Sequence, residues 1–132
     1  MIACKISTKL DKKMKPISQT KIDQLTLKTL EAFLVTARHE FPISSAILFG
    51  SHARNTATEN SDADVMLLLN GHHGNFVQTK LALADIAFDV MLDTGVRIDP
   101  LPIWEDQWIN PNTFSNPALL TNIKNDGVKF DL

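Results

Sequence analysis

The chain has 132 residues, of which 44% are hydrophobic and 21% charged, and its formal net charge is −2 at pH 7. These values predict one globular domain that is large enough for a hydrophobic core without disulfide bonds. The single cysteine, Cys4, excludes a disulfide framework and a thiolate metal cluster, and no apolar run is long enough for a membrane span or a secretory signal. We therefore expect a cytoplasmic protein with no membrane contact.

The net charge conceals an uneven distribution along the chain. Residues 1–28 carry a net charge of +5, whereas residues 29–132 carry −7. We divide the chain into a basic N-terminal arm, residues 1–19, and one domain, residues 20–132. The acidic body argues against direct nucleic-acid binding by the domain. The arm is either a solvated tail or an electrostatic handle for RNA or an acidic partner.

Hydrophobic periodicity and turn residues predict four elements in the first half of the domain. An amphipathic helix over 22–40 ends before Pro42, because the residue that precedes a proline disfavours helix. A short apolar strand over 44–49 follows. A short helix over 51–57 then leads to a second strand over 63–69, which an Asn-Gly turn ends.

Three further elements complete the expected fold. The pattern predicts a second long helix over 75–94, which Gly95 ends, and a third strand over 96–103. Two prolines in that strand confine it to a sheet edge or a short ladder. A last helix spans about 116–125. The order of elements predicts an α/β fold with a small mixed sheet flanked by helices.

The most informative segment joins the first two predicted strands. It contains Gly50-Ser51, a spacer of ten residues, and then Asp62 and Asp64. Side chains two residues apart in a strand point to the same face, so these aspartates present two carboxylates side by side. The Gly-Ser turn can offer backbone N–H groups to phosphate oxygens. Metal-assisted attack on a nucleoside triphosphate requires this combination.

The segment resembles the signature of the nucleotidyltransferase superfamily, in particular its minimal nucleotidyltransferase (MNT) branch. The resemblance implies a polymerase-beta-like nucleotidyltransferase core over roughly residues 20–130. It implies that Gly50 and Ser51 bind the phosphates of ATP and that Asp62 and Asp64 bind Mg²⁺, with two ions in the complete site. Carboxylate oxygens are the ligands that Mg²⁺ prefers in proteins.

Superfamily members usually add a third carboxylate from the adjacent strand, and Asp99 stands at the matching place. The other possibility is that Asp99 is a surface residue at a strand end. A second set of aspartates competes for the same role, but its i, i+4 spacing indicates the solvated side of the second long helix. Its members are Asp85, Asp89 and Asp93.

Arg54 follows the Gly-Ser pair and either reaches the triphosphate or pairs with a surface acid. Asn55 stands where relatives commonly have glycine, and asparagine tolerates a left-handed backbone better than most residues. His52, inside the same loop, is a weaker candidate for a nucleotide contact. We expect the adjacent histidines His72-His73 to be exposed to solvent in a turn.

Two tryptophans near the C-terminus, Trp104 and Trp108, are expected to pack against the C-terminal segment. A partner-binding surface is the alternative for this pair.

The identity of the molecule that accepts the nucleotidyl group is inferred only from the resemblance. Minimal nucleotidyltransferases resemble the antitoxin of HEPN/MNT (type VII) toxin–antitoxin pairs, which transfers AMP to a tyrosine of its HEPN ribonuclease partner. The resemblance therefore implies a HEPN-type toxin as the partner. This chain contains no tyrosine and cannot be its own tyrosine acceptor. Two alternatives stay open: an antitoxin that acts by complex formation alone, and an enzyme that nucleotidylates a small molecule or RNA.

Overall fold

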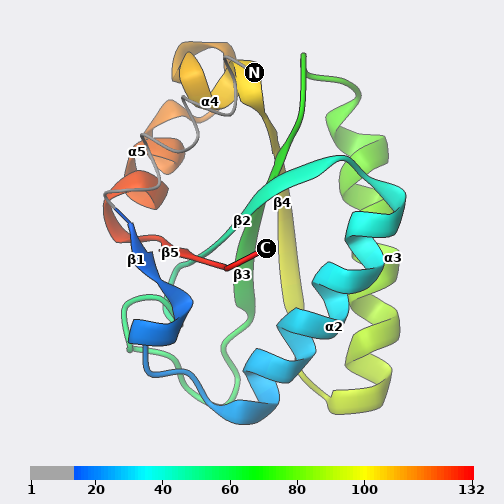
Figure 1. Ribbon diagram of the computed structural model, residues 1–132, viewed down its shortest axis with the longest axis vertical. Coiled ribbons are helices and arrows are strands. Elements are labelled where there is room, and N and C mark those ends of the chain that lie inside the picture. Colours follow the sequence, from blue (N-terminus) through cyan, green and yellow to red (C-terminus); the bar gives the residue numbers. More distant parts are fainter. Residues whose placement is uncertain (1–13) are drawn as a thin grey trace.

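A computed structural model describes residues 14–132 of the chain (Figure 1). Its strands form a single mixed sheet, and its helices lie on both faces of that sheet. In chain order they are β1 (Lys15–Pro16), a 3-10 helix (Ile17–Gln19), α2 (Gln24–Glu40), β2 (Ile43–Phe49), β3 (Ala63–Leu69), α3 (Phe76–Thr94), β4 (Ile98–Trp104), α4 (Glu105–Ile109), a 3-10 helix (Pro111–Thr113), α5 (Pro117–Asp126) and β5 (Val128–Lys129).

The five strands lie in the order β1-β5-β2-β3-β4. Strand β2 runs antiparallel to both β3 and β5, whereas β3 and β4 are parallel. A parallel pair needs a crossover connection, and α3 supplies it between β3 and β4. Pro100 and Pro102 lie in β4, which is an edge strand as predicted. The predicted mixed α/β fold is therefore confirmed.

Helices α2 and α3 lie side by side against one face of the sheet, and α4 and α5 lie on the other side (Figure 1). Because successive strand residues point to opposite faces, Val65 and Leu67 of β3 pack against α2 and α3. Met66 and Leu68 point to the opposite face, where they form a second hydrophobic cluster with Trp108 of α4 and side chains of α5. Asp64 therefore belongs to the face that α4 and α5 cover.

Capping residues define where the two long helices begin and end. The Asp23 carboxylate accepts a hydrogen bond from the backbone N–H of Thr26 at 3.0 Å, which starts α2 two residues later than its periodicity indicates. Asn75 caps α3 in the same way through Gln78. Gly95 ends α3 with a φ of 78°, a left-handed conformation that glycine adopts without strain.

The prediction of a short helix over 51–57 is wrong. Residues 50–55 form a turn instead, in which the Arg54 N–H donates to the Gly50 carbonyl at 3.2 Å. Asn55 ends this turn with a φ of 59°, the left-handed conformation that its side chain tolerates. Sequence periodicity also missed the short elements α4, β1 and β5, because two to five residues are too few to display a period.

Most of the predicted N-terminal arm, including Cys4, lies outside the described residues. Its last part, Lys15–Pro16, forms β1 and pairs in parallel with β5 at one edge of the sheet. Trp104 and Trp108 are buried, 7% and 2% exposed, and Trp108 packs against α5 as expected. Among the helices of residues 14–132, none is both long and apolar enough to cross a membrane.

Candidate active site

Three carboxylates meet at the end of the sheet where β3 and β4 begin. The parallel register pairs Asp64 of β3 with Asp99 of β4, so their side chains lie next to each other on the same face. Asp62 precedes β3 directly, and its charge acts on Asp64. The apolar side chains of the second hydrophobic cluster lie further along the same two strands, and they include Met66, Leu68 and Ile103. The acids therefore occupy the beginning of each strand.

Ionisation of Asp64 is disfavoured in this cluster. Burial raises the pKa of the Asp64 carboxyl to about 6, and the neighbouring carboxylates of Asp99 and Asp62 contribute to the increase. His52 and Arg54 oppose it with smaller effects. Like charges held in a partly desolvated site disfavour ionisation, and a bound cation would remove that penalty. The cluster is therefore a candidate cation site.

Two basic side chains flank the cluster, and sequence reasoning assigned a role to neither. The Arg97 Nε lies 3.0 Å from an oxygen of Asp62. The Lys80 Nζ lies 3.0 Å from Asp99 Oδ1 and donates to the Pro100 carbonyl at 2.7 Å. The position of Arg97, two residues before Asp99 and thus on the same face of an extended chain, was a signal available in the sequence. Lys80 carries no such signal, because it comes from α3.

Gly50 touches the cluster directly. It follows Phe49, which pairs across the antiparallel ladder with Asp64. Its φ is 75°, and a Cβ at this position would overlap the Asp64 carboxylate. Glycine is therefore required both by the backbone conformation and by the close approach of Asp64.

The spacer between Ser51 and Asp62 is held in place by its own polar contacts. His52 is buried, 9% exposed, and its Nε2 lies 3.3 Å from the Ser61 carbonyl. The Ser61 hydroxyl accepts from the Thr58 N–H at 2.9 Å. These contacts connect the Gly-Ser turn to the residue before Asp62. The burial of His52 is therefore explained by a structural role in this loop. The contacts fix the position of the turn relative to the acids.

The remaining predicted residues lie as follows. Arg54 is exposed, and its charge lowers the pKa of Asp64, so it lies within electrostatic reach of the cluster. Its contact with a triphosphate, like that of Ser51, stays a prediction. The competing aspartates of α3 are all exposed on the helix surface, as expected for a solvated face, and they are Asp85, Asp89 and Asp93.

Two cavities adjoin this region. The smaller, of about 290 Å³, lies between α3 and β4 and is lined by Asp62 and Asp99, with Phe88 and Met91 among its apolar walls. The larger, of about 1150 Å³, lies between the start of α2, the 51–61 loop and the end of α3. Asp64 and Asp99 do not line the larger cavity. The chemistry therefore places the candidate reaction centre at the carboxylates and not in the larger cavity.

Replacing Gly50 by alanine tests the contact between the turn and Asp64. We expect Gly50→Ala to lower the free energy of unfolding by about 1–3 kcal/mol because of its backbone conformation, and also to weaken binding of Mn²⁺ because the new methyl group displaces the Asp64 carboxylate. The matched control is Gly95→Ala, whose φ is 78° but whose added Cβ meets no atom within 4 Å. Denaturant unfolding and Mn²⁺ titration distinguish the two. Equal Mn²⁺ affinity in both variants would contradict the contact.

The pKa of Asp64 predicts a pH dependence of stability. Because this pKa is raised in the folded state, from 3.8 to about 6, the folded protein holds the proton more tightly than the unfolded chain. The resulting stabilisation is present at low pH and is lost as the pH rises from about 4 through about 6. We expect this loss in thermal melting curves of the metal-free protein and its absence in Asp64→Asn. Parallel pH profiles for the two proteins would refute the assignment.

The sequence matches a known protein family and a curated relative. Residues 30–129 match the family model described as nucleotidyltransferase domain. A protein of Methanocaldococcus jannaschii, named "Putative protein adenylyltransferase MJ1305", is 32% identical over 74 residues, which cover 54% of this chain and only 50% of that protein.

A solved structure gives a second comparison. The crystal structure described as "a putative nucleotidyltransferase from Sulfolobus solfataricus" is 15% identical and covers 84% of this chain and 89% of its own, with a TM-score of 0.47. The match to the family model spans well over half of the sequence, and Gly50, Asp62, Asp64 and Asp99 lie within the matched range. The chain therefore belongs to the nucleotidyltransferase domain family.

Proposed function

We propose that this protein is a Mg²⁺-dependent adenylyltransferase that moves AMP from ATP to a hydroxyl group of a partner protein. Transfer of a nucleotidyl group is the activity of its family. The observation that carries the proposal is the convergence of Asp62, Asp64 and Asp99 beside the Gly50 turn.

The donor set fits Mg²⁺. It consists of carboxylate oxygens alone, and its central carboxyl has a raised pKa that a cation would relieve. Asp62 and Asp64 would hold the ion that accompanies the triphosphate, and Asp99 would complete the set for a second ion. Bound Mg²⁺ neutralises charge on phosphate oxygens and lowers the pKa of an attacking hydroxyl group.

The protein's own groups position the substrates. Backbone N–H groups of Gly50 and Ser51 would donate to phosphate oxygens, and Arg54 adds a positive charge on the same side. The acceptor oxygen attacks the α-phosphorus, the bond from that phosphorus to the bridging oxygen breaks, and pyrophosphate leaves. The hydroxyl proton is released to water. Lys80 and Arg97 pair with Asp99 and Asp62 in this structure. If Mg²⁺ took their place beside these carboxylates, the two basic side chains could neutralise charge on the triphosphate.

A protein acceptor is supported by the name of the Methanocaldococcus relative, although the match spans half of that protein. The resemblance to minimal nucleotidyltransferases supports a HEPN-type toxin as the specific partner. The chain contains no tyrosine, so a tyrosine acceptor must come from another molecule.

One observation favours a second function. Ion pairs with Arg97 and Lys80 already neutralise two of the three carboxylates. This arrangement suits a protein that suppresses its partner by binding alone, without catalysis.

Transfer of a labelled nucleotide distinguishes these functions. We expect ATP labelled in its α-phosphate, but not in its γ-phosphate, to label the co-purifying partner in the presence of Mg²⁺. Asp64→Asn should reduce labelling by about 100-fold or more, because it removes a group that acts on the transition state. The matched control is Asp89→Asn, the same change on the exposed surface of α3, which should label normally.

The other possible outcomes of the labelling experiment would each change this proposal. Label on RNA or on a small molecule, with none on protein, would replace the acceptor class and retain the chemistry. Absence of label, with the partner still inhibited by the Asp62→Asn/Asp64→Asn double variant, would support the binding function. Undiminished labelling by Asp64→Asn would remove the acidic cluster from the mechanism.

A further inference from the structure

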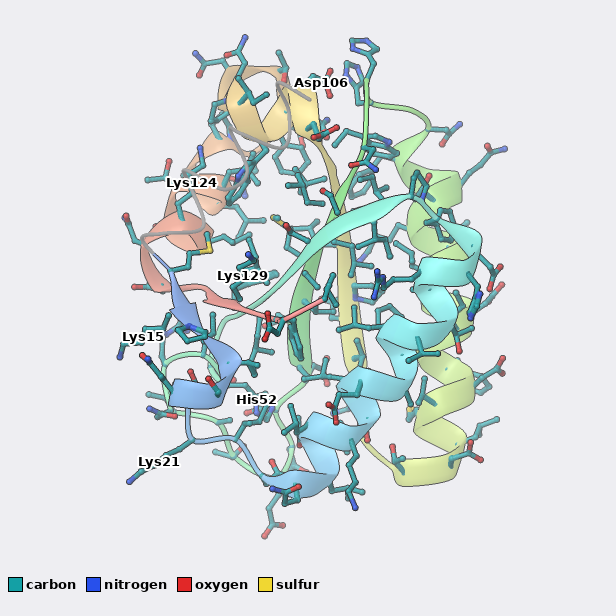
Figure 2. All side chains as sticks on the ribbon, viewed as in Figure 1. Lys15, Lys21, His52, Asp106, Lys124 and Lys129 are labelled. Carbon is teal, nitrogen blue, oxygen red and sulfur yellow. The ribbon has the colours of Figure 1, made fainter. Side chains whose placement is uncertain are left out.

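Two histidines and an aspartate, side chains of the kinds that can ligate metals, lie together at the opposite end of β3 from the acidic cluster. His72 and His73 lie in the turn between β3 and α3, and Asp106 lies in the first turn of α4. Figure 2 shows Asp106 at the top of the molecule and His52, in the loop beside the acidic cluster, towards the bottom. The seven residues of β3 separate the two ends by roughly 20 Å at ~3.3 Å per residue.

The two imidazoles converge on one carboxylate oxygen. His72 Nδ1 lies 2.9 Å and His73 Nδ1 2.6 Å from Asp106 Oδ2. The three ligand atoms lie within 4.8 Å of one another. Neither histidine is constrained by burial, since their side chains are 80% and 41% exposed. Their convergence therefore reflects attraction to Asp106 and not packing.

Within residues 14–132, the polar contacts of Asp106 are confined to one of its two carboxylate oxygens. Its second oxygen, Oδ1, is buried and has no hydrogen-bond partner among the described residues. Burial would raise the pKa of this carboxyl, but the hydrogen bond from His73 and the charges of both histidines outweigh it and lower the pKa. A buried acceptor without a partner is costly, and a bound cation compensates the charge of the whole carboxylate.

We propose that His72, His73 and Asp106 form a binding site for a divalent transition-metal ion, of which Zn²⁺ is the best candidate. Two imidazole nitrogens and one carboxylate are a ligand set that Zn²⁺ accepts and that Mg²⁺ does not favour. Ligand bonds of about 2.0–2.1 Å place neighbouring ligand atoms about 3.0–3.4 Å apart. The observed separations of 2.9 and 2.6 Å need to widen by less than one ångström, which the exposed imidazoles allow.

The ion would fasten the β3–α3 turn to α4. One link of this kind already exists, because the Gly71 N–H donates to a carboxylate oxygen of Glu105 at 2.7 Å. Gly74 of the same turn lies beside Trp104, since a Cβ added to Gly74 would reach the indole at 3.6 Å. With three protein ligands, the site leaves one position of a tetrahedral ion to water. It is separate in ligand chemistry from the acidic cluster, whose donors are carboxylates alone.

Zn²⁺ affinity, measured by competition with a chromophoric chelator on the full chain without a histidine tag, tests the site. We expect one high-affinity Zn²⁺ per chain and a higher thermal melting temperature when it is bound. His72→Gln and His73→Gln should each weaken binding by at least about ten-fold. Both changes are on exposed side chains, so folding is preserved. The matched control is His39→Gln, on the exposed surface of α2, which should bind Zn²⁺ normally.

Co²⁺ provides an independent measurement, since its visible spectrum reports the ligands directly. A Co²⁺ spectrum that both His72→Gln and His73→Gln alter, and His39→Gln leaves unchanged, would support the site. Zn²⁺ binding that survives both histidine changes but is lost in Asp62→Asn/Asp64→Asn would overturn it, because the ion would then occupy the acidic cluster. Failure to bind Zn²⁺ at micromolar concentrations would overturn it as well.

Discussion

The repulsion between carboxylates held side by side is the constraint on which the rest of this structure depends. Parallel pairing of β3 and β4 brings Asp64 and Asp99 together, and Asp62, directly before β3, adds a third carboxylate. Isolated carboxylates would separate, and here the strands prevent them from doing so. Buried apolar side chains on both faces, such as Leu67 and Met66, fix the two strands. The hydrophobic core therefore maintains a local arrangement of charge that is unfavourable and that a bound cation would relieve.

The surroundings of the cluster reduce this repulsion without removing it. Arg97 and Lys80 each pair with one outer carboxylate, and Asp64 between them forms no ion pair within residues 14–132. The Gly50 backbone approaches Asp64 so closely that a side chain would not fit. Asp64 is thus confined by main chain on one side and by like charge on the other. A bound cation would stabilise the ionised form of such a carboxyl, which suits the site proposed here for the ions that accompany a triphosphate.

The parts of the fold with long periodic patterns could be predicted from the sequence, and so could the segment that contains Gly50, Asp62 and Asp64. The turn at residues 50–55 was mistaken for a helix because its composition permits one, while the left-handed Asn55 and the contact of His52 with Ser61 decide against it. Contacts between distant segments could not be predicted either. Lys80 reaches Asp99 from another element, and the attraction of both His72 and His73 to Asp106 depends on where α4 begins. Local sequence does not encode these distances.

The most direct test of the acidic cluster is a crystal structure of the protein with Mn²⁺ and a non-hydrolysable ATP analogue. Anomalous scattering locates Mn²⁺ independently of the protein coordinates. We expect an anomalous peak within about 2.2 Å of carboxylate oxygens of Asp62 and Asp64, with the phosphates against the Gly50 turn and the Arg97 and Lys80 ion pairs broken. An analogue bound elsewhere in the protein, with no anomalous peak at Asp62, Asp64 or Asp99, would contradict this account.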